Sequence, residues 1–119
     1  MLLWAPGAAD DARHPGDDAL AAQIGAREGV CRIATPELGT LIAALSIADR
    51  VVCPDGGAMH LAAALGKPIV ALFGDSPVER WRPWGVPHRV VRPQSANLAD
   101  LALEPVLAAY AELAEDLKA

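Results

Sequence analysis

The clearest hydrophobic pattern in the chain lies between Val51 and Gly74, where two short apolar runs flank an alanine- and leucine-rich segment. The first run, Val51–Pro54, ends at proline, which has no N–H to donate to a sheet. Gly57–Leu65 predicts a helix with Gly66 as its C-cap, and Ile69–Phe73 predicts a buried strand. Together they predict a βαβ unit whose glycine turn lies at the carboxyl edge of a sheet, where ligands bind in such folds.

Shorter patterns on either side of this unit predict further strands alternating with helices. We expect strands over 2–4, 30–33 and 89–91, helices over 17–26, 35–49 and 105–117, and a long loop over 75–87. Helical spacing predicts that the following residues face inward: Leu20, Ile24, Leu38, Leu41, Ile42, Leu45, Val106, Tyr110, Leu113 and Leu117. The alternation predicts an α/β fold with a Rossmann-like, mostly parallel sheet of about five strands and helices on both faces, in one domain over 1–119.

Composition narrows the class of protein. A chain of 119 residues with 53% hydrophobic residues can bury one core, and its net charge of −5 argues against a nucleic-acid partner. No apolar run is long enough to span a membrane, and the N-terminus has no signal-peptide pattern, so we expect a cytoplasmic protein. Cys31 and Cys53 each lie in an apolar run and are predicted to be unpaired, buried thiols, and we expect no metal site.

The central unit resembles a known family. Asp55, Gly57 and His60, followed by Leu-Ala-Ala-Ala-Leu-Gly-Lys-Pro, an apolar strand and Phe-Gly, resemble the donor-site signature of glycosyltransferase family nine, the ADP-heptose–lipopolysaccharide heptosyltransferases. The later run Arg-Trp-Arg-Pro-Trp-Gly, residues 80–85, is similar to a Trp-x-Pro-x-Gly segment of that family. One departure is Gly56, where many members have Thr or Ser, so one hydroxyl contact to the donor is absent.

The resemblance implies that the chain is the later part of the C-terminal, donor-binding half of a GT-B glycosyltransferase. The first strand of that half, and the facing domain that carries the catalytic base and meets a lipid-linked saccharide acceptor, would then lie upstream of Met1. No residue of this chain is assigned as a catalytic base. An unpaired inner edge of a sheet favours pairing with another strand, so we expect self-association into a homo-oligomer. Peripheral association of the whole enzyme with a membrane is compatible with such an acceptor.

The resemblance also implies site residues in the central unit. The N–H groups of Gly56 and Gly57 would approach the donor diphosphate or sugar, Asp55 would accept hydrogen bonds from sugar hydroxyls, and His60 would contact the phosphate or sugar. Two simpler interpretations stay open. Asp55 could also cap the helix, and His60 could be a capping or loop-bonded histidine.

Residues outside the central unit have more ordinary alternatives. Asp17 and Asp18 follow the strand after which the family carries a carboxylate on the nucleotide ribose, but ordinary first-turn acids of a helix explain them equally well. We expect Trp81 and Trp84 to pack the loop that contains them. Asp75 has no assigned catalytic role.

These observations favour the donor-binding part of a heptosyltransferase-like enzyme, which would transfer a sugar from an ADP-sugar to a lipopolysaccharide-core acceptor without a cofactor. The alternative, from a different class, is a non-catalytic α/β module for binding or assembly derived from the same fold. Gly56 and the missing half of the enzyme favour that alternative. A GT-B nucleotide-sugar epimerase ranks last, because such enzymes carry a glutamate-rich donor motif.

Overall fold

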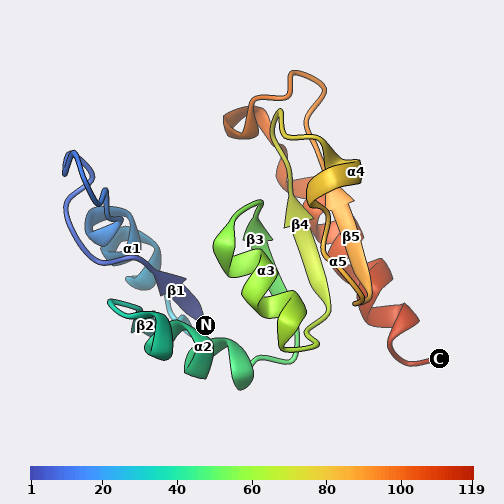
Figure 1. Ribbon diagram of the computed structural model, residues 1–119, viewed down its shortest axis with the longest axis horizontal. Helices are drawn as coiled ribbons and strands as arrows, with labels where there is room; N and C mark the ends of the chain where they lie inside the picture. The colour runs from blue at the N-terminus through green and yellow to red at the C-terminus, as the bar shows by residue number, and fades with distance from the viewer. The chain divides into compact units, whose positions relative to one another are not determined.

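The computed structural model describes residues 1–119, which form two compact units, residues 1–44 and 45–119 (Figure 1). Each unit contains its own parallel sheet, with two strands in the first unit and three in the second. None of the helices combines the length and the apolar character needed to cross a lipid bilayer. The expectation of one donor-binding domain over the whole chain stays a prediction.

The first unit contains a pair of short parallel strands. Its elements are β1 (Leu2–Trp4), α1 (Asp18–Gly25), β2 (Arg32–Ala34) and the first part of α2 (Leu38–Ser46). The register places Leu2 opposite Arg32. The loop between β1 and α1 is closed by a close backbone approach, because a Cβ on Gly16 would lie 2.5 Å from the backbone of Gly7. Glycine is therefore required at position 16.

The second unit is a three-stranded parallel sheet between helices. Its elements are β3 (Val51–Pro54), α3 (Gly57–Ala64), β4 (Ile69–Leu72), α4 (Val78–Trp81), β5 (His88–Val91), the 3₁₀ helix η1 (Leu98–Asp100) and α5 (Leu103–Asp116). The strand order is β3-β4-β5, with β4 in the centre. Helix α3 lies on one face of the sheet and α5 on the other (Figure 1). Because the three strands are parallel, their carboxyl ends meet at one edge of the sheet.

The core of the second unit is built on β4. Ile69, Val70 and Ala71 are fully buried, and Val70 packs in a cluster with Val91 of β5 and Leu113 of α5. Consecutive strand residues point to opposite faces, so Ile69 and Ala71 face the side covered by α3. The prediction of a buried strand in this segment is confirmed.

Helix α3 ends as the sequence predicts. Gly66 adopts a φ of +75°, and its N–H donates to Ala63 O at 2.9 Å while the N–H of Lys67 donates to Ala62 O at 3.0 Å. This pair of bonds is a Schellman motif, which satisfies carbonyls at the helix end and requires the left-handed conformation that glycine adopts easily. Lys67 Nζ also donates to Ser46 O at 2.7 Å, at the last residue of α2.

The α/β fold class is confirmed, and the strands within each sheet are parallel, but the five strands form two sheets instead of one. A hydrophobic pattern identifies strands without specifying which strands pair. Two local predictions also differ from the structure. The expected loop over 75–87 contains the short helix α4, and α5 begins at Leu103, two residues before Pro105. Proline is tolerated in the first turn of a helix because the N–H that it lacks has no intrahelical partner there.

Several residues predicted to face inward are exposed. They are Leu20, Ile24, Leu38, Tyr110 and Leu117, with 37–62% of their surface accessible. Ala21 in α1 and Ala109 in α5 are buried instead, each directly next to one of the exposed larger residues, whereas Leu113 of α5 is fully buried as predicted. The exposed ring of Tyr110 contacts a cation at the surface: its centroid lies 5.0 Å from the guanidinium carbon of Arg50.

Both cysteines are free thiols, as predicted, but only Cys53 is buried. The burial prediction is wrong for Cys31, which lies exposed just before β2, where a sheet of only two strands leaves its side chain uncovered. Burial of Cys53, with a smaller contribution from the negative charge of Asp55, raises the pKa of its thiol to about 11.

The difference in exposure between Cys31 and Cys53, together with the raised pKa of Cys53, predicts that a thiol reagent at pH 8 modifies only Cys31 in the folded chain. Cys31 is accessible, whereas Cys53 is shielded and stays protonated, and the thiolate is the reactive form. Mass spectrometry after labelling with iodoacetamide checks this, with Cys31→Ser as the control that should leave the folded chain unlabelled. Rapid labelling of both cysteines in the folded chain would contradict it.

Candidate functional site

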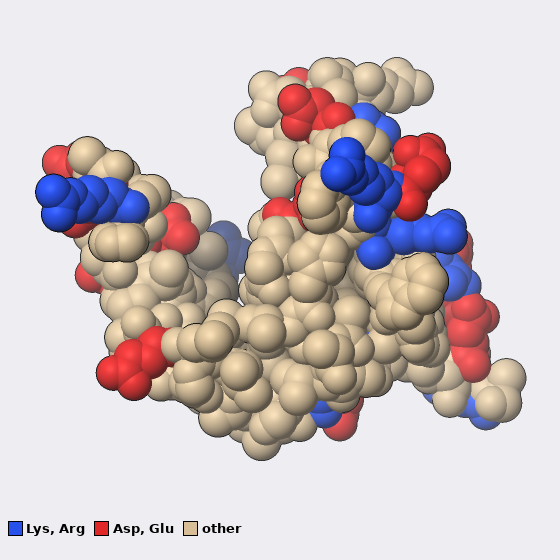
Figure 2. Space-filling view, viewed as in Figure 1, with Lys and Arg blue, Asp and Glu red and all other residues tan.

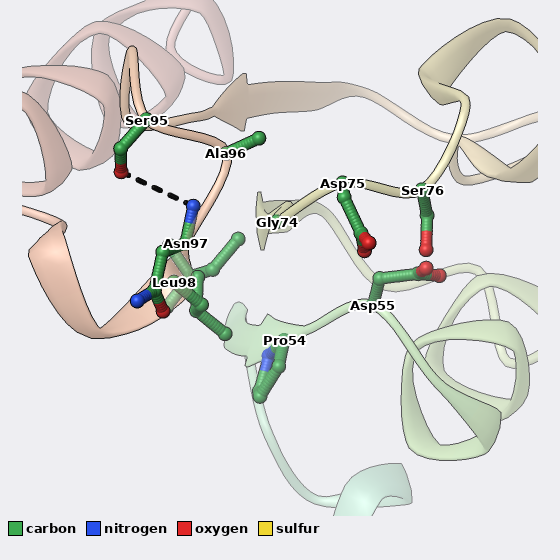
Figure 3. A pocket seen from close by; sticks show the side chains of 10 residues that line it. Pro54, Asp55, Gly74, Asp75, Ser76, Ser95, Ala96, Asn97 and Leu98 are labelled. Atoms are coloured by element: carbon green, nitrogen blue, oxygen red, sulfur yellow. Dashed lines mark hydrogen bonds between the residues drawn. The ribbon is translucent and has the colours of Figure 1, made fainter.

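A pocket of about 530 Å³ lies at the carboxyl edge of the three-stranded sheet (Figure 3). Three segments line most of it: residues 54–55 at the end of β3, residues 74–76 after β4 and residues 95–98 after β5. Parallel strands bring these segments together although they are far apart in sequence. The pocket therefore occupies the place where α/β folds bind ligands.

One wall of the pocket is a turn held by its own side chains. Ser95 Oγ accepts a hydrogen bond from Asn97 N–H at 3.1 Å and donates one to Asp100 Oδ2 at 2.7 Å. Between them Ala96 has a φ of +59°, a left-handed conformation that is unusual for a residue with a side chain. A Cβ on Gly74 would lie 3.1 Å from Ala96 O, so glycine at position 74 lets the turn pass close to the end of β4.

The N-terminus of α3 begins beside Asp55 and is open. Its N-cap residue is Gly56, which provides no side-chain cap, and the N–H groups of the first turn have no partner within the helix. A Cβ on Gly56 or Gly57 would meet no atom within 4 Å, so another group can approach the backbone closely. Free N–H groups and the positive end of the helix dipole suit this position to an anion.

Asp55 extends β3 and reaches the pocket. Its N–H donates to Leu72 O at 2.9 Å, which fixes its backbone at the end of the ladder. The helix that follows is capped by Gly56 and receives no capping hydrogen bond from a side chain. The carboxylate of Asp55 therefore does not cap α3, and it lines the pocket instead.

His60 lies in the first turn of α3 and contacts the aromatic segment. Its ring centroid is 6.2 Å from that of Trp81, with the ring planes tilted by 58°, and the guanidinium carbon of Arg80 lies 5.2 Å from the Trp81 ring. Trp84 is 85% exposed, so the prediction that it packs the loop is wrong. The neighbouring Pro83 is the buried residue there, and it anchors the segment in place of the indole.

Asp17 and Asp18 lie in the first unit, at the start of α1. Trp4 Nε1 donates to Asp18 Oδ1 at 2.9 Å, and this bond, together with the backbone N–H of Gly7, lowers the pKa of Asp18. Asp18 thus has a structural role in closing the loop between β1 and α1. Asp17 is the N-cap residue of α1 and makes no capping hydrogen bond with its side chain.

The chain matches glycosyltransferase family 9 (heptosyltransferase) over residues 3–111. It belongs to this family. It is 34% identical over 88 residues to lipopolysaccharide heptosyltransferase 2 from Salmonella typhimurium and from Escherichia coli, and the matched region covers 72% of the chain. The chain spans only 25% of the length of these two relatives.

Two solved structures share the fold. The family 9 glycosyltransferase from Veillonella parvula superposes with a TM-score of 0.69 at 23% identity, covering 82% of this chain and 33% of that one. The E. coli heptosyltransferase WaaC with ADP also gives a TM-score of 0.69, at 24% identity, covering 78% of this chain and 29% of that one. The likeness to part of a GT-B-like glycosyltransferase is therefore confirmed at the level of the fold.

Family 9 membership agrees with the resemblance seen in the sequence, whereas the roles of the individual site residues stay predictions. The structure brings Asp55, Gly56, Gly57 and His60 together around the start of α3 in the second unit. Asp17 and Asp18 belong to the first unit.

Two further residues of the family 9 chain line the pocket beside Asp55; sequence reasoning considered Asp75 without assigning it a role and did not consider Ser76. Asp75 and Ser76 directly follow Gly74 at the end of the buried strand β4. Their position was the available signal, because polar residues that directly follow adjacent parallel strands meet at the same edge. No group of three or more His, Cys, Asp or Glu side chains gathers as metal ligands anywhere in the chain.

Proposed function

We propose that this chain is the donor-binding part of a heptosyltransferase-like enzyme that transfers a sugar from an ADP-sugar to a lipopolysaccharide-core acceptor. Family 9 membership supports the reaction class, and the relatives named lipopolysaccharide heptosyltransferase 2 support the acceptor class. A structural neighbour with ADP supports the nucleotide. The proposal assigns no metal ion or cofactor, and the nucleotide-sugar is a substrate.

The observation that carries the proposal is the open N-terminus of α3 beside the carboxylate of Asp55. A nucleotide-sugar carries a diphosphate next to a neutral ring rich in hydroxyl groups. The N–H groups at Gly56 and Gly57 suit the first part, and a carboxylate that accepts O–H hydrogen bonds suits the second. His60 lies in the first turn of the same helix, and the proposal assigns it a contact to the phosphate or the sugar.

This arrangement also accounts for how the chain would assist the reaction. When the bond between sugar and diphosphate breaks, negative charge grows on the leaving diphosphate. Preoriented N–H groups at a helix start stabilise such charge without having to reorganise. A base that deprotonates the acceptor is still required, and the proposal assigns that role to a part of the enzyme outside this chain.

The proposal predicts that the purified 119-residue chain binds ADP with a dissociation constant in the millimolar range, because an exposed helix start provides most of the contacts. Titration followed by ¹H–¹⁵N NMR should shift the amide signals of Gly56 and Gly57 most strongly. The amides of Lys118 and Ala119, at the far end of α5, are the internal control. Absence of saturable binding of ADP, with UDP equally silent, would contradict the proposal and favour the non-catalytic assembly module.

A further inference from the structure

Helix α5 carries an apolar stripe that its own sheet does not cover. The helix packs on the sheet through a separate set of residues, which includes Ala109 and the fully buried Leu113. The residues of the stripe are all large and 39–65% exposed: Leu103, Leu107, Tyr110 and Leu117. A contiguous exposed apolar surface of this kind marks an interaction site more often than a chance arrangement.

The stripe has the spacing of a coiled-coil seam. Steps of four, three, four and three residues lead from Leu103 through Leu107, Tyr110 and the half-buried Ala114 to Leu117. This alternation keeps the apolar residues on one side of α5 along its whole length. It is also the pattern by which two helices pack side by side, so the stripe is suited to a second helix.

The two flanks of α5 differ in chemistry. On one flank Arg89 of β5 binds Glu112 at 3.4 Å and also Asp116. Figure 2 shows charged side chains of both signs along this side of the unit, over α4, β5 and the end of α5. The stripe lies on the other flank, because Tyr110 contacts Arg50, the residue directly before β3.

The sheet beside the stripe is also uncovered. Val52 of β3 lies opposite Val70 in the parallel register, so it faces the same side of the sheet as α5. Helix α5 packs mainly on β4 and β5, and Val52 stays 46% exposed. A helix that docks along the stripe would lie over β3 and cover this valine as well.

The side chains of the stripe are complementary to one another when two copies of α5 run antiparallel. Leu107 of one helix then meets Leu117 of the second copy. In the next layer the large ring of Tyr110 meets the small side chain of Ala114. The same contacts recur on the other side of a twofold axis, so a second copy of the chain is a matching occupant.

The charges at the ends of the stripe favour the same direction. Glu104 lies beside its first residue and Lys118 beside its last, and both are exposed. An antiparallel pair brings Glu104 next to Lys118 of the second copy at both ends, whereas a parallel pair would bring like charges together. The bond from Lys118 to Glu115 within the chain does not compete strongly, because both side chains are 72% exposed.

We propose that the exposed stripe of α5 is the docking surface for a second copy of this chain, with the two helices antiparallel. Helix α3 lies on the opposite face of the sheet, so the start of α3 stays open in both copies (Figure 1). The pairing needs no ligand and is independent of the proposed function. It also differs from pairing through the edge of a sheet, which uses backbone groups of a strand.

Sedimentation velocity of the full chain over a concentration series tests the proposal, in reducing buffer so that the exposed Cys31 does not crosslink two chains. We expect an equilibrium between monomer and dimer. Leu107→Glu should raise the dissociation constant of the dimer about tenfold, because it buries a carboxylate in the seam. The matched control is Leu20→Glu in α1, also on a helix and 53% exposed, which should stay within twofold. Circular dichroism shows that each variant is folded.

Exchanging the end charges is a second test that leaves the apolar seam intact. Glu104→Lys and Lys118→Glu should each weaken the dimer about threefold, and the double variant should return to within twofold of the wild type. Pairing through the edge of β3 would respond to neither change. A monomer at every concentration would overturn the proposal, as would a dimer that Leu107→Glu leaves unchanged or that the double charge exchange does not restore.

Discussion

Replacing Phe73 with alanine is expected to lower the free energy of unfolding by about 4 kcal/mol. Phe73 is the largest fully buried side chain of the chain, and it directly precedes Gly74, which lines the pocket. Its removal leaves a cavity in a small core, whereas its N–H can still donate to Val91 O, a bond of 2.9 Å. The loss is therefore a packing effect.

Urea denaturation followed by circular dichroism measures this loss. Leu107→Ala is the control, because Leu107 on α5 is 57% exposed and should cost less than about 1 kcal/mol. Phe73→Leu, which keeps most of the volume, should fall between the two and remain folded even if the alanine variant does not. Similar small losses for Phe73→Ala and Leu107→Ala would contradict the assignment of Phe73 to the core.

The second large effect concerns binding. Gly57→Asp is expected to weaken ADP binding at least tenfold, because a carboxylate at the first position of α3 competes with the diphosphate for the same N–H groups and repels it. The same change should stabilise the chain by about 0.5–1 kcal/mol, since glycine is a poor helix residue and an acid is favourable in the first turn. A Cβ at this position meets no atom within 4 Å, so the substitution causes no clash.

Gly57→Asp is expected to weaken ADP binding while it raises the stability of the chain, so a loss of affinity cannot be attributed to unfolding. Gly57→Ala separates the two effects, because it should share the gain in stability while losing far less affinity. Binding is measured by NMR titration with ADP and stability by thermal unfolding. Unchanged ADP affinity in the aspartate variant would show that the diphosphate binds away from the start of α3.

The segment from Val51 to Gly74 was predictable because several local signals agree within it. Pro54, Gly66 and Gly74 each mark the end of an element for a separate physical reason, and the apolar runs between them have the lengths of strands and helices. The Schellman motif at Gly66 follows directly from such reasoning. Membership of family 9 was predictable from the same stretch, because its polar residues have a specific spacing.

Side-chain burial was predicted less well, because it depends on partners that the local pattern does not specify. Leu20 is exposed while Ala21 is buried, and periodicity alone cannot show which side of a short, alanine-rich helix meets a neighbour. The pairing of strands into two sheets was unpredictable for the same reason. Asp75 was given no role from the sequence, because its place beside Asp55 in the pocket arises from the ends of β3 and β4 meeting at one edge, which is a property of the fold.

The open start of α3 has a consequence for how the site behaves when it is empty. With Gly56 as its N-cap residue, the helix has no side chain to satisfy its first N–H groups, so solvent must do so. A bound anion would take the place of the missing cap, and its binding free energy would be shared with the folding of that turn. Such a ligand would suppress fraying of the helix. The equilibrium constant for local opening would fall by a factor of one plus the ratio of ligand concentration to dissociation constant. The donor would then be part of the secondary structure that holds it.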